Sequence, residues 1–203
     1  MHKFEPLTAV VLVDNNMGIG SGSDILFHCR PFREQQMRIL ANYPVIMGRT
    51  AYESFPWEKV PAMWCSRILL LSSTAKPDGR AEIFRSVSEL IDACPRRTMV
   101  FGGECTFKAL LPYCSTIMAC QADIELPADR RFPVALGKNK CWKVCERSKV
   151  LQGPHKLDVP CQFVTYARDI RVEPVRWPDG RANQLPTCGY KKRRLMASLR
   201  GAI

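Results

Sequence analysis

The sequence predicts an α/β fold with a mostly parallel central sheet, flanking helices and a C-terminal antiparallel hairpin. Two observations predict it. Short apolar runs of strand composition alternate with helical stretches over residues 9–111, and two later strand-like runs are separated by a short segment containing Gly153 and Pro154. Strands that alternate with helices are typical of parallel sheets, whereas strands joined by a short turn pair antiparallel.

The expected parallel strands cover residues 9–13, 44–47, 68–71 and 98–101. These runs are short and rich in Val, Ile, Leu or Met, as in strands that are buried on both faces. The expected helices cover residues 33–42, 50–55, 87–93 and 105–111. The expected hairpin pairs residues 142–150 with residues 161–168.

The chain divides into a folded domain and a basic extension. Its 203 residues are enough for one sizeable core, which we assign to residues 1–170. Residues 171–203 carry eight Lys and Arg against two acidic residues, and so contribute +6 of the net charge of +11. No apolar run approaches the roughly 20 residues that a membrane helix needs. The first strand also begins too early to leave room for a cleavable signal peptide, so we expect neither feature.

The ten cysteines raise the alternatives of a disulfide framework or a metal site. Their spacing supports neither, because Cys141 and Cys145 are four residues apart, Cys114 and Cys120 are six apart, and no Cys-x2-Cys pair is present. Free cysteine usually behaves as a small buried hydrophobe. We therefore expect structural thiols, no metal, and a reducing intracellular compartment.

Successive sequence blocks resemble the dihydrofolate reductase family in order and spacing. They are the strand at 9–13 followed by DNNMGIG at 14–20, PVIMGRT at 44–50 with YES at 52–54, ILLLSS at 68–73, MVFGG at 99–103, LLP at 110–112, FP at 132–133 and QFVTYAR at 162–168. The resemblance extends from residue 9 to residue 168 and implies a dihydrofolate reductase-like fold.

The resemblance also implies an NADPH site at the turns that follow the parallel strands. Its residues would be Gly48, Arg49, Thr50, Ser72, Ser73, Gly102 and Gly103. Glycine permits the close backbone approach of a diphosphate, and arginine and hydroxyl groups donate to phosphate oxygens. Two changes oppose binding: Glu104 replaces a small residue and Ala51 replaces a threonine. We expect no cofactor, and NADPH remains the open alternative.

The family has a buried Asp or Glu at the start of its first long helix, which helps to protonate the substrate. Counting with the loop length of vertebrate enzymes places this role on Arg33, and counting with the shorter bacterial helix places it on Phe32. Neither side chain is a proton donor for this reaction. Glu34 is the fallback acid. We favour the alignment with Arg33, because Met37 then occupies an apolar position of the family, and this alignment puts a cation in the substrate pocket.

Other substrate-side positions depart from the family as well. Arg130 replaces the threonine that contacts the catalytic acid, and Ser66 replaces the arginine that binds the substrate carboxylate. Arg67 is adjacent, but neighbouring residues of a strand point to opposite faces. Leu26 and Phe27 replace a Pro-Trp pair. We therefore expect no catalytic residue and no bound folate.

Two functions of different classes fit these observations. The favoured one is a catalytically degenerate family member that serves as a structural subunit of a mitochondrial ribosome or a respiratory-chain complex. It would bind protein subunits or RNA through its basic tail. The expected partner-binding residues are Lys191, Lys192, Arg193, Arg194 and Arg200. The alternative is an active NADPH-dependent reductase, acting on dihydrofolate or resembling the related pyrimidine reductases.

Overall fold

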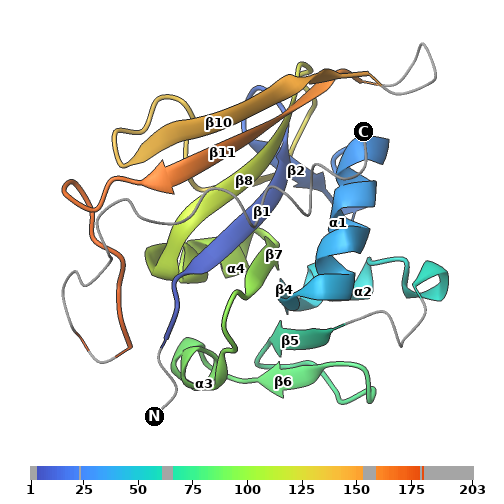
Figure 1. Ribbon diagram of the computed structural model, residues 1–203. Coiled ribbons are helices and arrows are strands. Elements are labelled where there is room, and N and C mark those ends of the chain that lie inside the picture. The colour runs from blue at the N-terminus through green and yellow to red at the C-terminus, as the bar shows by residue number, and fades with distance from the viewer. Residues whose placement is uncertain (1–3, 23, 61–65, 153–158, 179, 181–203) are drawn as a thin grey trace.

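A mixed sheet of eight strands, in the order β10-β11-β8-β1-β7-β4-β5-β6, forms the centre of the molecule (Figure 1). The structure, a computed structural model, describes residues 4–22, 24–60, 66–152, 159–178 and 180. Neighbouring strands from β8 to β6 are parallel, whereas β11 is antiparallel to both β8 and β10. This architecture confirms the predicted mostly parallel sheet with a C-terminal antiparallel hairpin.

The strands of this sheet are β1 (Leu7–Val13), β4 (Pro44–Gly48), β5 (Arg67–Leu71), β6 (Glu82–Phe84), β7 (Met99–Gly102), β8 (Cys114–Ala122), β10 (Trp142–Leu151) and β11 (Cys161–Arg168). All four predicted parallel strands and both hairpin strands are present. Neither β6 nor β8 was predicted from the sequence. Since β8 pairs with β1 on one side and β11 on the other, it attaches the hairpin to the parallel strands.

The helices are α1 (Arg30–Asn42), α2 (Arg49–Glu53), α3 (Val87–Ala93) and α4 (Glu104–Leu110), with short 3-10 turns η1 (Trp57–Lys59) and η3 (Leu111–Tyr113). The helix α1 begins three residues before its predicted start at residue 33, and Pro31 lies in its first turn, where proline is well tolerated. Within the described part of the chain, no helix combines the length and apolarity needed to cross a membrane.

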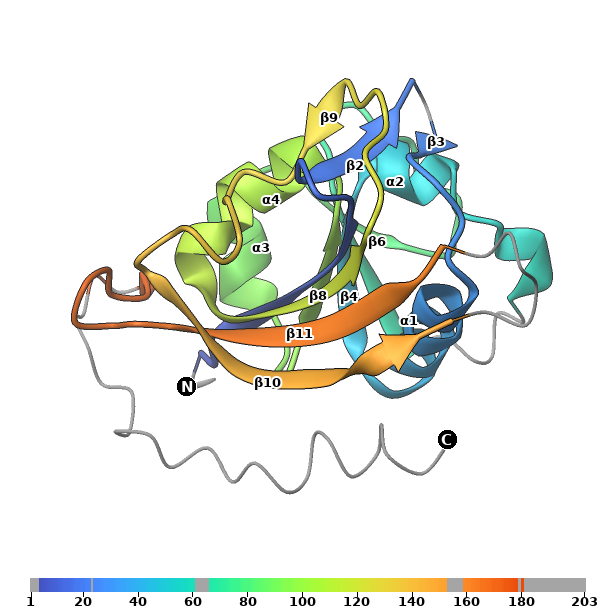
Figure 2. The ribbon, with the colours of Figure 1, turned by 90° about the horizontal axis from the view of Figure 1, so that it is seen from above.

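The central strand β1 supplies side chains to two hydrophobic clusters, one on each face of the sheet. Leu7 and Val11 pack with the residues of α3 and α4, whereas Val10 and Leu12 pack with those of α1 and α2. Figure 2 shows α3 and α4 on one side of the sheet and α1 on the other. Helices on both faces explain why this strand is continuously apolar from residue 9 to residue 13 rather than alternating.

A second, small sheet lies beside the carboxyl end of β1. It has the order β3-β2-β9 and consists of β2 (Gly18–Ser21), β3 (Asp24–Ile25) and β9 (Arg130–Arg131) (Figure 2). The buried carboxylate of Asp14 accepts hydrogen bonds from the backbone amides of Gly18 at 2.6 Å and Leu126 at 3.1 Å. One acidic side chain therefore fixes both the turn into β2 and the loop that leads to β9.

The described residues that follow β11 pack against the domain. Val175 is only 2% exposed, the amide of Arg176 donates to the carbonyl of Pro112 at 2.9 Å, and the rings of Trp177 and Phe4 make an edge contact. Residues 171–177, which we assigned to the extension, thus contact the N-terminal end of β1 and the region of η3.

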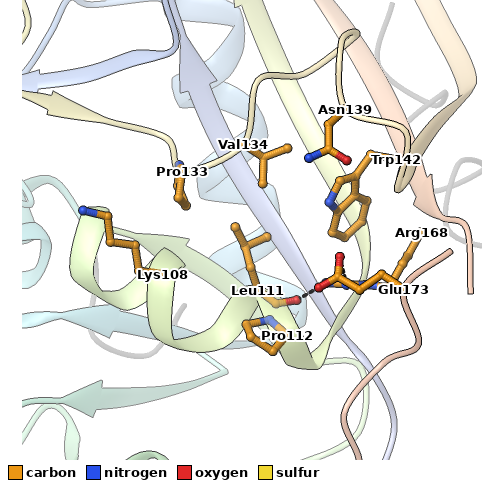
Figure 3. A pocket seen from close by; sticks show the side chains of 9 residues that line it. All are labelled: Lys108, Leu111, Pro112, Pro133, Val134, Asn139, Trp142, Arg168 and Glu173. Atoms are coloured by element: carbon orange, nitrogen blue, oxygen red, sulfur yellow. Dashed lines mark hydrogen bonds and ion pairs between the residues drawn. The ribbon is translucent and has the colours of Figure 1, made fainter. Parts of the chain in front are cut away.

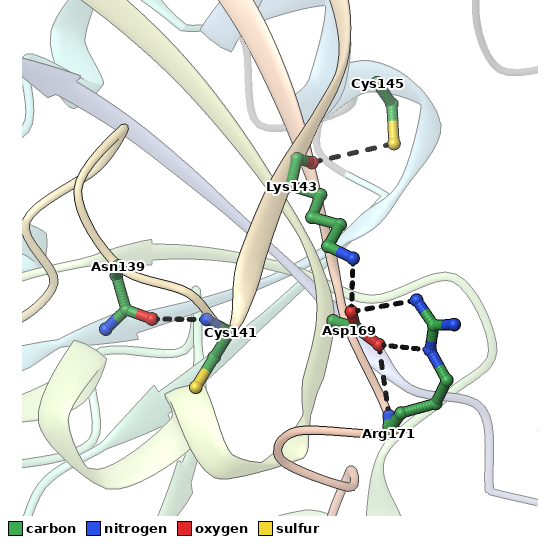
Figure 4. A network of polar contacts seen from close by, with 6 residues as sticks. All are labelled: Asn139, Cys141, Lys143, Cys145, Asp169 and Arg171. Carbon is green, nitrogen blue, oxygen red and sulfur yellow. Dashed lines mark hydrogen bonds and ion pairs between the residues drawn. The ribbon is translucent and has the colours of Figure 1, made fainter.

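A network of polar contacts holds the start of this segment (Figure 4). Asp169 accepts from Lys143 on β10 at 2.6 Å and from the guanidinium of Arg171 at 3.1 Å. Hydrogen bonds from Arg171, and then from Lys143, hold the pKa of the Asp169 carboxyl well below its usual range. The amide of Asp169 also donates to the carbonyl of Cys141, so the chain leaves β11 in a fixed direction.

Candidate functional site

The residues expected to bind the cofactor lie at the carboxyl ends of three neighbouring strands. Gly48 ends β4, Gly102 ends β7, and Ser72 directly follows β5, and these strands are adjacent in the order β7-β4-β5. Ligands of open α/β sheets bind outside the carboxyl ends of the strands. The fold therefore brings the predicted residues to one edge of the sheet.

Two of the glycines at this edge are explained by packing. A Cβ atom on Gly48 would lie 2.2 Å from the hydroxyl oxygen of Thr106, and one on Gly102 would lie 2.2 Å from the ring of Phe107. Gly102 also has a φ of +94°, which favours glycine. At Gly103 nothing lies within 4 Å of the corresponding position, so this turn leaves room for a ligand beside its backbone.

Two of the polar side chains at this edge, those of Ser72 and Arg49, already have partners within the chain. The Ser72 hydroxyl accepts hydrogen bonds from its own turn, including the Ala75 amide at 3.0 Å, so it has a structural role. Ser73 is exposed. Arg49 pairs with Glu53 at 3.0 Å, and both side chains are at least half exposed. Exposed pairs of this spacing contribute only about 0.3–0.5 kcal/mol, so Arg49 can turn towards an anion.

The negative charge of Glu104 would repel an anion bound at the same edge of the sheet. Its carboxylate is paired with Lys108. The hydrogen bond from Lys108 lowers the pKa of Glu104, so the group stays negatively charged. The backbone geometry therefore fits a diphosphate, and Arg49 with Ser73 could hold it, whereas the charge of Glu104 weakens the fit.

A cavity of about 110 Å³ lies between β1, α1 and the small sheet. Its lining includes the apolar side chains of Val10, Leu12, Ile19, Ile25, Leu26, Phe27, Phe32, Phe101 and Phe107, and the polar side chains of Asp24, Gln36, Thr50, Ser54 and Arg130. Cavities that hold small-molecule ligands usually enclose roughly 300–1,000 Å³. Large aromatic side chains thus leave little room in this one.

The helix α1 presents Phe32 and Gln36 to the cavity. Arg33 and Glu34 are exposed, and Glu34 pairs with Arg30 at 3.0 Å. The side chain of Arg33 therefore lies outside the cavity, whereas Phe32, the residue given by the shorter-helix count, lines it. The reason is helical periodicity: residues 32, 35, 39 and 40 are the buried positions of α1, and residue 33 lies outside that face. Which of the two takes the position of the family's acid stays a prediction.

The ionisable side chains that line the cavity come from other elements. Arg130 on β9 enters it with 30% of its side chain exposed, and its nearest carboxylate, on Asp129, is 3.8 Å away. Asp24 on β3 is the acid in the lining, and its carboxylate accepts from the adjacent Ile25 amide. Asp24 was not predicted from the sequence, because β3 has two residues and joins the cavity lining only where it pairs with β2.

Arg67, which is adjacent to the position of the family's substrate-binding arginine, is bonded to another residue of the sheet. Arg67 makes two hydrogen bonds of 2.5 Å to the carboxylate of Glu82 on the neighbouring strand β6, and Ser66 is exposed. Arg67 is not among the residues that line the cavity. Both findings place Arg67 at the β5–β6 edge of the sheet.

A second hollow, of about 200 Å³, lies beside η3 and is lined by Lys108, Leu111, Pro112, Pro133, Val134, Asn139, Trp142, Arg168 and Glu173 (Figure 3). The buried guanidinium of Arg168 donates to the carbonyls of Cys114 and Leu111 and stacks on the ring of Trp142. Glu173 pairs with Arg168 at 2.9 Å. Arg168 therefore closes the junction between η3 and β8, away from the carboxyl ends of the parallel strands.

Three thiols meet in the core on the α1 side of the sheet. The Sγ atoms of Cys29, Cys120 and Cys161 all lie within 4.8 Å of one another, and all three residues are buried. Hydrogen bonds to the other two thiols, and burial, raise the pKa of Cys120. Sequence spacing could not reveal this group, because Cys29 is 91 residues from Cys120 and 132 from Cys161.

The sheet order, the glycine turn and the cavity against β1 define an α/β domain of the nucleotide-binding type. The model of the dihydrofolate reductase family matches residues 6–168. The chain belongs to the dihydrofolate reductase family, as the resemblance implied, and has that family's fold. A relative, "Dihydrofolate reductase 1" of Haloarcula marismortui, is 25% identical over 148 residues, which cover 63% of this chain and 78% of the relative.

Proposed function

We propose that this chain is a catalytically degenerate member of the family that does not reduce dihydrofolate and instead serves as a structural subunit of a larger assembly. The observation that carries the proposal is Phe32, which occupies the face of α1 that lines the cavity. A phenyl ring has no proton to deliver, and acid catalysis requires a group within hydrogen-bond reach of the reacting atom.

The neighbourhood of Phe32 supports the same conclusion. Gln36, one turn further along α1, carries a neutral amide, and the carboxylate of Glu34 is exposed beside Arg30. The volume of about 110 Å³ is also below the range typical of ligand sites. Reduction of dihydrofolate would require both a larger cavity and a different acid.

The basic extension supports a role in an assembly. The family match ends at residue 168, whereas residues 171–203 carry a net charge of +6. The expected partner-binding residues Lys191, Lys192, Arg193, Arg194 and Arg200 lie outside the described residues. Clustered positive charge attracts RNA phosphates or an acidic protein surface. We propose a mitochondrial ribosome or a respiratory-chain complex as the assembly.

One observation favours the alternative of an active NADPH-dependent reductase. Asp24, an exposed acid, and Arg130, which lies 3.8 Å from the Asp129 carboxylate, belong to the cavity lining beside the small sheet, whereas α1 contributes Phe32 and Gln36 there. An enzyme that acts on a different substrate, as the related pyrimidine reductases do, could use Asp24 as a proton donor. Arg49, Ser73 and the turn at Gly103 would then hold the cofactor.

The test of catalysis is a titration of the purified chain with NADPH, followed by dihydrofolate, while cofactor fluorescence and absorbance are recorded. We expect no hydride transfer. Phe32→Glu restores a carboxylate on the cavity face, and Phe32→Gln is its uncharged control. Turnover by the unmodified chain would contradict the proposal. Asp24→Asn and Glu34→Gln would then identify the acid.

The test of the structural role replaces the five basic residues at positions 191–194 and 200 by glutamine. We expect this variant to leave the high-molecular-weight fractions of a cell extract in which the unmodified chain sediments. A matched variant with five exposed lysines of the domain, Lys59, Lys76, Lys138, Lys140 and Lys149, replaced by glutamine should remain there. If the extension variant also remained in these fractions, the extension would be ruled out as the binding element. A steep loss of binding with added salt would indicate RNA rather than protein.

A further inference from the structure

The three buried thiols described above are supplied by three separate elements. Cys29 is the residue that precedes the first turn of α1, Cys120 lies within β8, and Cys161 is the first residue of β11. Cys161 pairs with Ala122 and Phe163 pairs with Cys120 in the antiparallel ladder, so both cysteines point to the same face of the sheet. The start of α1 lies over that face and adds the third thiol.

The separations of the three thiols are close to those required around a metal ion bound by three sulfur atoms. The Sγ atom of Cys29 is 3.9 Å from that of Cys120 and 3.3 Å from that of Cys161. Three sulfurs at a metal–sulfur distance of about 2.3 Å around a central ion lie roughly 4 Å from one another. Small side-chain adjustments would therefore bring all three into contact with one ion.

The surroundings select the kind of ion. The three residues belong to the hydrophobic cluster on the α1 side of the sheet, with Met118, Ala122, Val159 and Leu151 among its members. Soft sulfur ligands select Cu(I) or Zn²⁺, but structural zinc is almost always four-coordinate. A site of three sulfurs in an apolar setting fits Cu(I) better.

The position of Cys29 supplies a favourable electrostatic contribution. It is the N-cap of a helix of 13 residues, and its side chain makes no capping hydrogen bond. The amino end of a helix carries a partial positive charge, which stabilises an anion such as a thiolate. This charge would offset part of the negative charge that metal-bound thiolates bring into the core.

From this geometry we infer that Cys29, Cys120 and Cys161 form a binding site for one thiophilic metal ion, with Cu(I) as its preferred occupant. Binding displaces thiol protons to solvent and forms three metal–sulfur bonds, without a change of oxidation state. The site joins α1 to β8 and β11, and it lies three residues before Phe32, so the ion would fix the helix that faces the cavity.

The test uses the full-length chain, reduced and handled without oxygen, and titrates it with Cu(I) against a coloured Cu(I) chelator. We expect one ion per chain, and an X-ray absorption spectrum dominated by sulfur neighbours at about 2.3 Å. Loss of a residue that only hydrogen-bonds to a metal ligand weakens metal affinity by roughly 10- to 100-fold. Replacing any one of the three cysteines by alanine removes a ligand itself, so it should weaken the affinity for Cu(I) by more than this.

Matched controls separate this site from the other thiols. Cys94→Ala removes a buried cysteine of the other hydrophobic cluster, and Cys145→Ser removes an exposed one. Cys65 and Cys188, which lie outside the described residues, are replaced together in a third control. All three controls should bind Cu(I) as the unmodified chain does.

Several results would overturn the inference. The chelator could retain all the copper, the alanine variants could bind as tightly as the controls, or the spectrum of the unmodified chain could show nitrogen or oxygen neighbours in place of sulfur. The spectrum is measured on the unmodified chain, so it decides the question even if an alanine variant fails to fold. Tight binding of Zn²⁺ but not Cu(I) at the same cysteines would overturn the choice of ion.

Discussion

At the scale of single residues, Phe32 has the largest consequence for function. It is 6% exposed and lines the cavity from α1, whereas the neighbouring Arg33 and Glu34 are exposed. One residue of helix register therefore decides whether an aromatic ring, a cation or a carboxylate faces the cavity.

Gly48 provides a test of how tightly the edge of the sheet is packed. A methyl group there would lie 2.2 Å from the Thr106 hydroxyl oxygen, so Gly48→Ala should lower the free energy of unfolding by about 1–3 kcal/mol. In the double variant with Thr106→Ala the clash is removed, and the two effects should not add. Urea denaturation of the four chains of this cycle measures the coupling, and strict additivity would show that the backbone simply moves away.

The lowered pKa of Asp169 predicts that the stability of the fold depends on pH. Its pKa is lowered in the folded chain by Arg171 and Lys143, relative to about 3.9 in an unfolded chain. A carboxyl group with a lowered folded pKa stabilises the fold fully above its unfolded pKa, and loses that contribution as the pH falls below it. The difference in melting temperature between the unmodified chain and Asp169→Asn should be constant from about pH 6 to 8 and shrink below about pH 4. A difference that is as large at pH 3 as at pH 7 would contradict this.

At the scale of elements, local signals fix the short helices where capping is strong. The helix α3 occupies Val87–Ala93, the residues predicted for it, and the Ser86 hydroxyl accepts a hydrogen bond from the Glu89 amide at 3.2 Å. The helix α1 has no side-chain cap and begins earlier than predicted. The start of α1 is therefore set by packing on the sheet rather than by a local signal.

Removal of the Ser86 hydroxyl, which caps α3, should measurably lower the stability of the fold. Ser86→Ala should lower the free energy of unfolding by about 0.5–2 kcal/mol, whereas Ser86→Asp should retain most of the stability. Ser73→Ala, at an exposed serine, is the matched control and should change stability by less than about 0.5 kcal/mol. Chemical denaturation of the three variants makes the comparison, and equal values for Ser86→Ala and Ser73→Ala would show that the cap contributes nothing.

At the scale of the whole molecule, the sheet and the segment after β11 connect distant parts of the sequence. β8 joins the parallel strands to the hairpin, and Val175 returns the chain to the region of η3 and β1. The first part of the predicted extension is thus part of the folded core, so removal of all residues from 171 would test folding and assembly together.

Two valines three residues apart test this packing. Val175 is 2% exposed and Val172 is 56% exposed. Val175→Asp places an unpaired charge in the core and should destabilise the chain by about 3 kcal/mol or more, whereas Val172→Asp should change stability by less than about 0.5 kcal/mol. Thermal unfolding followed by circular dichroism distinguishes them. Similar melting temperatures for the two variants would mean that this segment does not pack on the domain in solution.

Much of the architecture could be predicted from local patterns. The apolar runs that became β1, β4, β5 and β7, and the hairpin of β10 and β11, have periodicities that a sequence displays directly. β8 was not predicted, because Cys114–Ala122 mixes polar and apolar residues with no simple alternation. The strands β2, β3 and β9 were missed because two-residue and four-residue strands form only by pairing with one another.

The sequence by itself determined the fold class, the family and the edge of the sheet where the glycine turns gather, since these depend on short motifs and their order. Tertiary structure alone decided that Phe32 rather than Arg33 faces the cavity, that Asp24 and Arg130 reach it, and that three distant cysteines meet. These outcomes depend on helix register and on contacts between residues far apart in the chain, and such contacts leave no mark on local spacing.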